Sequence, residues 1–164
     1  MDQVELTERL RRLGCPDPEG WARSQIEEGI PQLVRYVFLR QAWKRILGEN
    51  DHGWIENVLQ NLQRSPDAPY AGQGHALKRL KELGARDEDL TDLVRGAQAE
   101  LLFDFCYLLE DPGELEGEIS DLSWALVELD SEGHVLERIG SLHESVLETD
   151  PTGREMAPRP SASR

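Results

Sequence analysis

The feature that most constrains this chain is a nine-residue run at positions 101–109, LLFDFCYLL, in which Asp104 is the only charged residue. Apolar residues cover almost the whole circumference of a helix drawn through this run, which predicts a helix buried among other elements. The pattern continues upstream as the longest helix of the chain, expected from Glu88 to about Glu110 with Asp87 as its N-cap. The fold must therefore supply neighbours on every side of that helix.

Apolar residues at helical spacing, interrupted by glycine and proline, supply those neighbours. Gly14 is a natural C-cap for the first helix, and Asp17 followed by Pro18 is a typical start for the second. The linker at 65–70 separates the fourth helix from the fifth. The five helices expected before the long one cover residues 4–13, 18–28, 31–47, 53–63 and 74–83.

The residue composition of the chain changes after residue 121, from helix-forming to strand-forming residues. Two segments rich in strand-forming residues, 124–129 and 135–139, flank a turn with Gly133 in the left-handed position, which predicts a β-hairpin. Residues 145–147 fit either a third strand or a short helix. The Pro-, Ser- and Arg-rich end, 151–164, is expected to be a disordered tail.

The predicted fold class is therefore α+β and predominantly α-helical: a multi-helix domain followed by a C-terminal β-hairpin and a disordered tail. Residues 1–150 are expected to form a single globular domain, since the chain of 164 residues is long enough for one core. Within it, residues 4–64 and 74–111 would be the helical units and 122–140 the hairpin.

A similarity at a spacing of about 70 residues raises the question of an internal repeat. The segment RLRRLG at 9–14 resembles RLKELG at 79–84, and the apolar stretches at 33–39 and 102–108 resemble each other. Either the two units repeat, or amphipathic helices resemble each other by composition. A repeat places Arg35 and Asp104 at equivalent buried positions, and because buried charges need partners, it predicts that they pair or that each finds another opposite charge.

The charges are divided unevenly along the chain, whose net charge is −14. Residues 1–48 hold eight basic and seven acidic side chains, whereas residues 49–150 hold seven basic and 24 acidic ones. Such a field repels nucleic acid and anionic membranes and attracts cationic partners. The acidic side chains of the helix–hairpin connection are either a solvated link or a docking strip for a basic protein: Glu110, Asp111, Glu114, Glu116, Glu118 and Asp121.

The chain is expected in the cytoplasm. No apolar run approaches the roughly 20 residues of a membrane span, and the N-terminus lacks the features of a secretory signal. Two isolated cysteines, Cys15 and Cys106, do not form a disulfide framework. The preference for arginine over lysine points to a GC-rich bacterial genome.

Motifs that carry chemistry are missing from the sequence. There is no phosphate-binding glycine loop, nucleophile elbow or zinc spacing, so no catalytic residue, metal or cofactor is expected. A single Glu-x-x-His ending at His52 falls in a loop, where a di-metal site would need it twice on helices. The local grouping Ser141, His143, Glu144 and Ser145 is not a triad, because triads are assembled from separate elements.

These observations favour a non-enzymatic interaction protein of the inhibitor, immunity or regulatory kind, whose acidic second half binds a cationic protein. The alternative is a small ligand-binding protein or enzyme with a pocket between the helical units. Its candidate residues, which include ionisable groups beside aromatics, are Arg35, Arg40, Asp104 and Tyr107. The third alternative is a homodimer formed through an apolar face.

Overall fold

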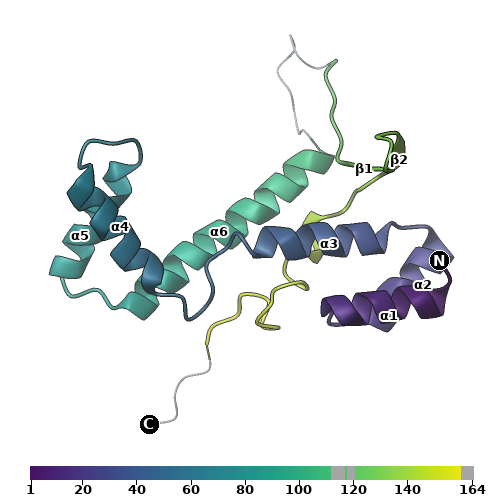
Figure 1. Ribbon diagram of the computed structural model, residues 1–164, viewed down its shortest axis with the longest axis horizontal. Coiled ribbons are helices and arrows are strands. Elements are labelled where there is room, and N and C mark those ends of the chain that lie inside the picture. Colours follow the sequence, from purple (N-terminus) through teal and green to yellow (C-terminus); the bar gives the residue numbers. More distant parts are fainter. Residues whose placement is uncertain (112–116, 118–120, 160–164) are drawn as a thin grey trace. The chain divides into compact units, whose positions relative to one another are not determined.

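The computed structural model describes residues 1–111, 117 and 121–159 and confirms the predicted fold class (Figure 1). Six helices precede a two-stranded antiparallel hairpin near the C-terminus. They are α1 (Gln3–Leu13), α2 (Pro18–Glu28), α3 (Gln32–Trp43), α4 (Gly53–Arg64), α5 (Ala71–Glu82) and α6 (Asp87–Glu110), followed by β1 (Val127–Leu129), β2 (Val135–Arg138) and the 3₁₀ turn η2 (His143–Ser145). None of the described helices combines the length and apolar character needed to cross a membrane.

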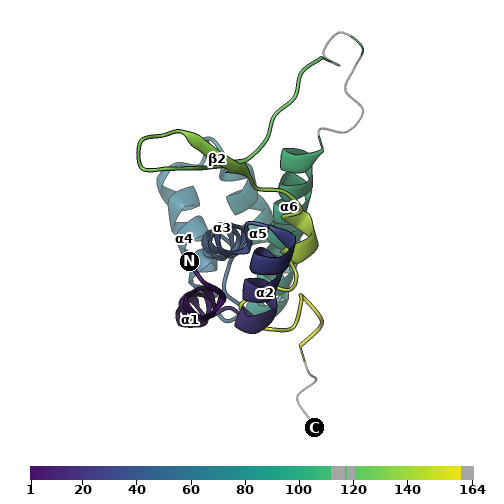
Figure 2. The ribbon, with the colours of Figure 1, turned by 90° about the vertical axis from the view of Figure 1, so that its right-hand side faces the viewer.

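The predicted caps position the first helices. Gly14 ends α1 in the left-handed conformation with φ 84°, which glycine adopts without steric cost. The Asp17 carboxylate accepts a hydrogen bond from the Gly20 amide at 2.9 Å, and Pro18 occupies the first turn of α2. Both α1 and α3 are seen nearly end-on in Figure 2, so their axes are almost aligned, and α2 packs against both.

The chain divides into two compact units, and the division falls inside α6. Unit 1 consists of residues 1–45 and 99–164, and unit 2 of residues 46–98. This division differs from the helical units 4–64 and 74–111 suggested by the sequence, because α4 packs against α5 across the predicted linker. Each unit has a core of its own.

The core of unit 2 lies between α4, α5 and the first half of α6, around Ile55, Leu77 and Leu90. A Cβ added to the buried Gly74 would lie 3.0 Å from the Cβ of Leu62, so glycine is what allows α5 to approach α4 closely. Beside this core, the indole of Trp54 donates a hydrogen bond to the fully buried hydroxyl of Thr91 at 3.1 Å.

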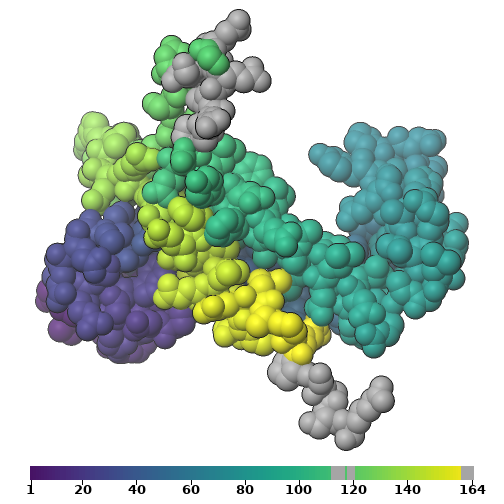
Figure 3. All heavy atoms as spheres, turned by 180° about the vertical axis from the view of Figure 1, so that it is seen from behind, coloured from purple at the N-terminus to yellow at the C-terminus, as the bar shows by residue number. Residues whose placement is uncertain are grey.

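The core of unit 1 has two parts. Leu6 and Leu10 of α1 pack with Trp21 of α2 and Tyr36 of α3, whose rings meet edge to face at 5.6 Å. The second part is the C-terminal segment, which we define as residues 139–150. Figure 3 shows this yellow-green segment lying against the N-terminal helices. Its buried side chains recur every three or four residues, singly or as adjacent pairs: Ile139, Leu142, Ser145 with Val146, and Thr149 with Asp150.

The C-terminal segment settles two questions that the sequence left open. Residues 143–145 form the 3₁₀ turn η2, so the prediction of a short helix agrees better with the structure than the prediction of a strand. The first residues of the predicted tail are also folded. The buried carboxylate of Asp150 accepts hydrogen bonds from the Thr152 amide and hydroxyl and from the Met156 amide. Residues 160–164 lie outside the described part of the chain.

Candidate functional site

The prediction that residues 101–109 are buried on all sides is wrong. Cys106 is buried and faces the interior with Leu102, but the opposite face of α6 is open to solvent. Leu101, Phe105 and Leu108 recur at helical spacing along that face and are exposed by 55%, 55% and 42%. We call these three residues and Asp104, which lies among them, the outer stripe of α6.

Asp104 does not become the partner of Arg35. Its side chain is exposed on the outer stripe, and among the described residues no ion pair joins it to Arg35. The expected buried charge pair is therefore wrong at Asp104. An aspartate on an exposed face needs no buried counter-ion, because water solvates it.

Arg35, by contrast, is buried as predicted, with 4% of its surface exposed. Its guanidinium donates hydrogen bonds to Gln32 Oε1 at 2.7 Å, to the Ser141 carbonyl at 2.5 Å and to Ser145 Oγ at 3.1 Å. Burial lowers the pKa of Arg35, whereas the nearby Glu144 and Glu110 raise it. Arg35 thus fastens the C-terminal segment to α3.

Tyr107 and Glu110, the first residue of the predicted docking strip, also hold the C-terminal segment in place. The rings of Phe103 and Tyr107 meet the His143 ring edge to face, at 5.7 Å and 5.0 Å. The Glu110 carboxylate lies 3.3 Å from His143 Nδ1 and accepts a hydrogen bond from the Ser141 amide at 2.7 Å. Glu110 therefore holds the C-terminal segment, while 29% of its side chain stays exposed.

The remaining strip residues divide in two groups. Asp111 and Asp121 are exposed, as the docking interpretation requires. Glu114, Glu116 and Glu118 lie outside the described residues.

The hairpin beside the outer stripe is also exposed. All four residues of β2 face solvent, and Leu129, Val135 and Leu136 are exposed by more than half of their surface. Two hydrogen bonds tie the hairpin region to the end of α6: the Trp124 indole donates to the Leu108 carbonyl at 2.6 Å, and Arg138 donates to the Glu110 carbonyl at 2.8 Å. The hairpin and outer stripe are thus positioned by the same helix end.

Two carboxylates face each other across the hairpin. Glu128 of β1 is the direct partner of Glu137 of β2, an arrangement in which like charges destabilise the pairing of strands. Among the described residues, neither carboxylate takes part in a salt bridge. The turn itself is well held, because Asp130 accepts hydrogen bonds from the amides of Glu132 and His134 and from the His134 ring.

Arg40 lines a groove of about 410 Å³ in unit 1, formed by α3, the turn after α1 and the end of the C-terminal segment. The other pocket candidates from the sequence, Arg35, Asp104 and Tyr107, do not line it. Lys44, one helical turn after Arg40, does. In the sequence, the pair Arg40 and Lys44 is marked by two basic residues at a spacing of four on an apolar helix face.

Two other groups bear on possible chemistry. Burial raises the pKa of both Cys15 and Cys106 to about 11, so neither thiol is an activated nucleophile at neutral pH. Over residues 1–111, 117 and 121–159, no cluster of histidine, cysteine and carboxylate side chains could hold a metal ion.

In unit 2, Tyr70 is 92% exposed with a left-handed φ of 68°, an uncommon conformation for an aromatic residue.

Comparisons of the chain with models of protein families, with curated proteins and with solved structures found no match.

Proposed function

We propose that the protein is an interaction module that binds a basic protein through the outer stripe of α6 and the adjacent β-hairpin. The observation that carries this proposal is the exposure of the outer stripe, where Leu101, Phe105 and Leu108 lie in a row open to water. An exposed row of large apolar side chains on a helix, rimmed by polar residues, is typical of a binding surface.

The charges around this surface determine the kind of partner. Asp104 lies within the outer stripe. Glu128 and Glu137 face each other across the adjacent hairpin, where they line a groove together with Arg9 of α1. A cationic side chain placed between the two glutamates would remove their repulsion and gain two charge-assisted contacts. A partner segment that combines apolar residues with arginine or lysine therefore complements the surface.

The cytoplasm is the proposed setting, because both cysteines are free thiols, as is usual in a reducing compartment.

The test is affinity capture from the native lysate with four forms of the full chain as bait. Phe105→Ser removes an aromatic side chain from the outer stripe, and Leu101→Ser removes a leucine. Leu93→Ser is the matched control, because Leu93 is exposed by 67% on the same helix but belongs to unit 2. Circular dichroism checks that each variant keeps the helical content of the wild type.

We expect one basic protein to be retained by wild type and Leu93→Ser at low salt, released at moderate salt, and lost from Phe105→Ser and Leu101→Ser. Truncating a central aromatic anchor typically weakens binding by 2 kcal/mol or more, a factor of about 30. Retention that is the same for all four baits, or a captured protein without a basic surface, would contradict the proposal. Sedimentation of the chain alone would reveal instead a dimer formed by the same stripe.

A further inference from the structure

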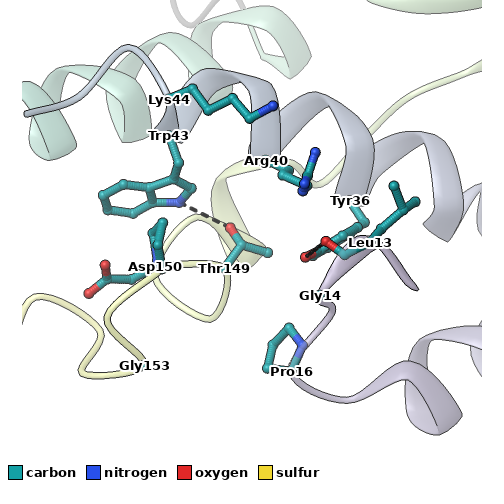
Figure 4. Close-up of a pocket in the computed structure, with 11 residues that line it drawn as sticks. Leu13, Gly14, Pro16, Tyr36, Arg40, Trp43, Lys44, Thr149, Asp150 and Gly153 are labelled. Atoms are coloured by element: carbon teal, nitrogen blue, oxygen red, sulfur yellow. Dashed lines mark hydrogen bonds between the residues drawn. The ribbon is translucent and has the colours of Figure 1, made fainter. Parts of the chain in front are cut away.

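A second surface of unit 1, the groove that Arg40 and Lys44 line, shares no residue with the outer stripe or the hairpin. Figure 4 shows Arg40 on α3 and Lys44 at its C-cap, with Trp43, Tyr36 and Thr149 around the groove and Pro16 at its lower edge. Its volume of about 410 Å³ lies in the range of sites for small organic molecules.

The two basic side chains are the groups that the groove offers to a ligand. Arg40 lies in the last turn of α3, and Lys44 is the C-cap four residues later with helical φ and ψ, so the two side chains project to the same side. Within the described part of the chain, neither forms an ion pair or a side-chain hydrogen bond. Two cations without partners in one groove are unexpected in a chain that holds 32 acidic and 18 basic residues.

The polar atoms of the aromatic walls are already engaged. The Trp43 indole donates to the Val146 carbonyl at 3.0 Å and to Thr149 Oγ1 at 3.2 Å, and the Tyr36 hydroxyl donates to the Leu13 carbonyl at 3.3 Å. The walls therefore offer apolar surface, to which Leu13 adds, and the positive charges remain to recognise a ligand.

The one acidic residue among the lining is engaged in a turn of its own segment. Asp150 is buried, and its carboxylate accepts hydrogen bonds from Thr152 and Met156 in the turn that follows it. Figure 4 shows this carboxylate directed away from Arg40 and Lys44.

We propose that the groove binds a small organic anion, whose carboxylate or phosphate group contacts Arg40 and Lys44 and whose apolar body lies against Trp43 and Tyr36. Arginine and lysine one turn apart can share the oxygens of one anionic group, arginine in a bidentate manner and lysine as a point charge. The apolar walls select a ligand with a ring or a short hydrocarbon body over a bare ion.

The proposal is tested by titrating the full chain, labelled with ¹⁵N, with phenyl phosphate, benzoate and inorganic phosphate in turn. The indole N–H of Trp43 is a reporter inside the groove. We expect saturable shifts at this indole and at the amides around residues 40–44 with phenyl phosphate or benzoate. The tighter of the two identifies the anionic group, and inorganic phosphate binds more weakly because it has no apolar body.

The double variant Arg40→Gln/Lys44→Gln is expected to raise the dissociation constant at least tenfold. The control, Arg9→Gln/Arg23→Gln, removes the same charge from exposed positions of α1 and α2 and leaves binding unchanged. Lys44, Arg9 and Arg23 are exposed and Arg40 is half-buried without an ion pair, so both variants are expected to keep the fold, which thermal unfolding verifies. The proposal is overturned if neither organic anion shifts the Trp43 indole saturably, or if both double variants weaken binding equally.

Discussion

Arg35 should be the most sensitive position of unit 1, because one side chain connects α3 to two points of the C-terminal segment. The perturbation is Arg35→Met, which keeps the length and apolar stem of the side chain but removes the guanidinium. The Ser141 carbonyl and the Ser145 hydroxyl then lose their donor in a site that water does not reach freely.

The expected loss follows from the three hydrogen bonds of the guanidinium. Hydrogen bonds to a charged group contribute roughly 1.5–3 kcal/mol each, and three would give more than 4 kcal/mol. The same burial that lowers the pKa of Arg35 shows that the charge is partly desolvated, and methionine avoids that cost. The net destabilisation is therefore about 3 kcal/mol, a large fraction of the stability of an ordinary domain.

The assay is urea unfolding followed by circular dichroism, with Arg40→Met as the control, since a half-exposed arginine without an ion pair should cost less than about 0.5 kcal/mol. A double-mutant cycle with Ser145→Ala should show coupling of about 1 kcal/mol, because the two side chains share a bond. If Arg35→Met costs less than about 1 kcal/mol, or no more than Arg40→Met, then the guanidinium does not hold the C-terminal segment to α3.

Three further results are expected. Tyr70→Gly should stabilise the chain by about 1 kcal/mol, because Tyr70 is 92% exposed and holds a left-handed conformation that glycine adopts freely. Thermal unfolding measures this, and a lower melting temperature would show that the tyrosine ring makes a stabilising contact. The thiols of Cys15 and Cys106, whose pKa values are about 11 in the folded chain, should resist a thiol reagent at pH 8 until urea unfolds the chain, and rapid labelling of the native protein would contradict this. The free energy of unfolding should fall between about pH 9 and pH 11, because in that range only the thiols of the unfolded chain lose their protons. Hydrogen bonds from the His134 amide, then from its ring, lower the pKa of Asp130. The ionised carboxylate should therefore stabilise the turn above about pH 4, and this stabilisation should be lost as the pH falls through the lowered pKa of Asp130. Amide chemical shifts of residues 130–134 that do not change on acidification would contradict this.

The local chemistry of the helices could be predicted well from the sequence. Gly14 and Asp17 cap α1 and α2 as expected. Asp87, expected as the N-cap of the longest helix, is instead the first residue of α6. These signals depend on a few neighbouring residues, whose conformations are decided within one helical turn.

The surroundings of the longest helix could not be predicted in the same way. An apolar run shows that a surface avoids water, but it does not distinguish a side covered by the chain itself from a side that meets a partner. Phe105 and Cys106 are neighbours in the same run, yet one is exposed and the other is buried. The assumption that every apolar residue is covered within one chain placed Asp104 wrongly in the interior.

The sequence of the C-terminal segment contains a spacing pattern that indicates burial. Ile139, Leu142, Val146 and Thr149 follow the spacing of three and four residues that marks one buried face. The segment is interrupted by glycine and polar residues, so its spacing does not correspond to a regular helix. Its burial depends on Arg35, Trp43 and Glu110, which lie far away in the sequence.

The central claim is that the outer stripe of α6 binds a basic protein, and the affinity of the captured protein for wild type and Phe105→Ser tests it most directly. Calorimetric titration at low salt should show a dissociation constant at least tenfold weaker for Phe105→Ser, with Leu93→Ser equal to wild type. Equal affinities for wild type and Phe105→Ser would show that the partner binds elsewhere and would contradict the claim.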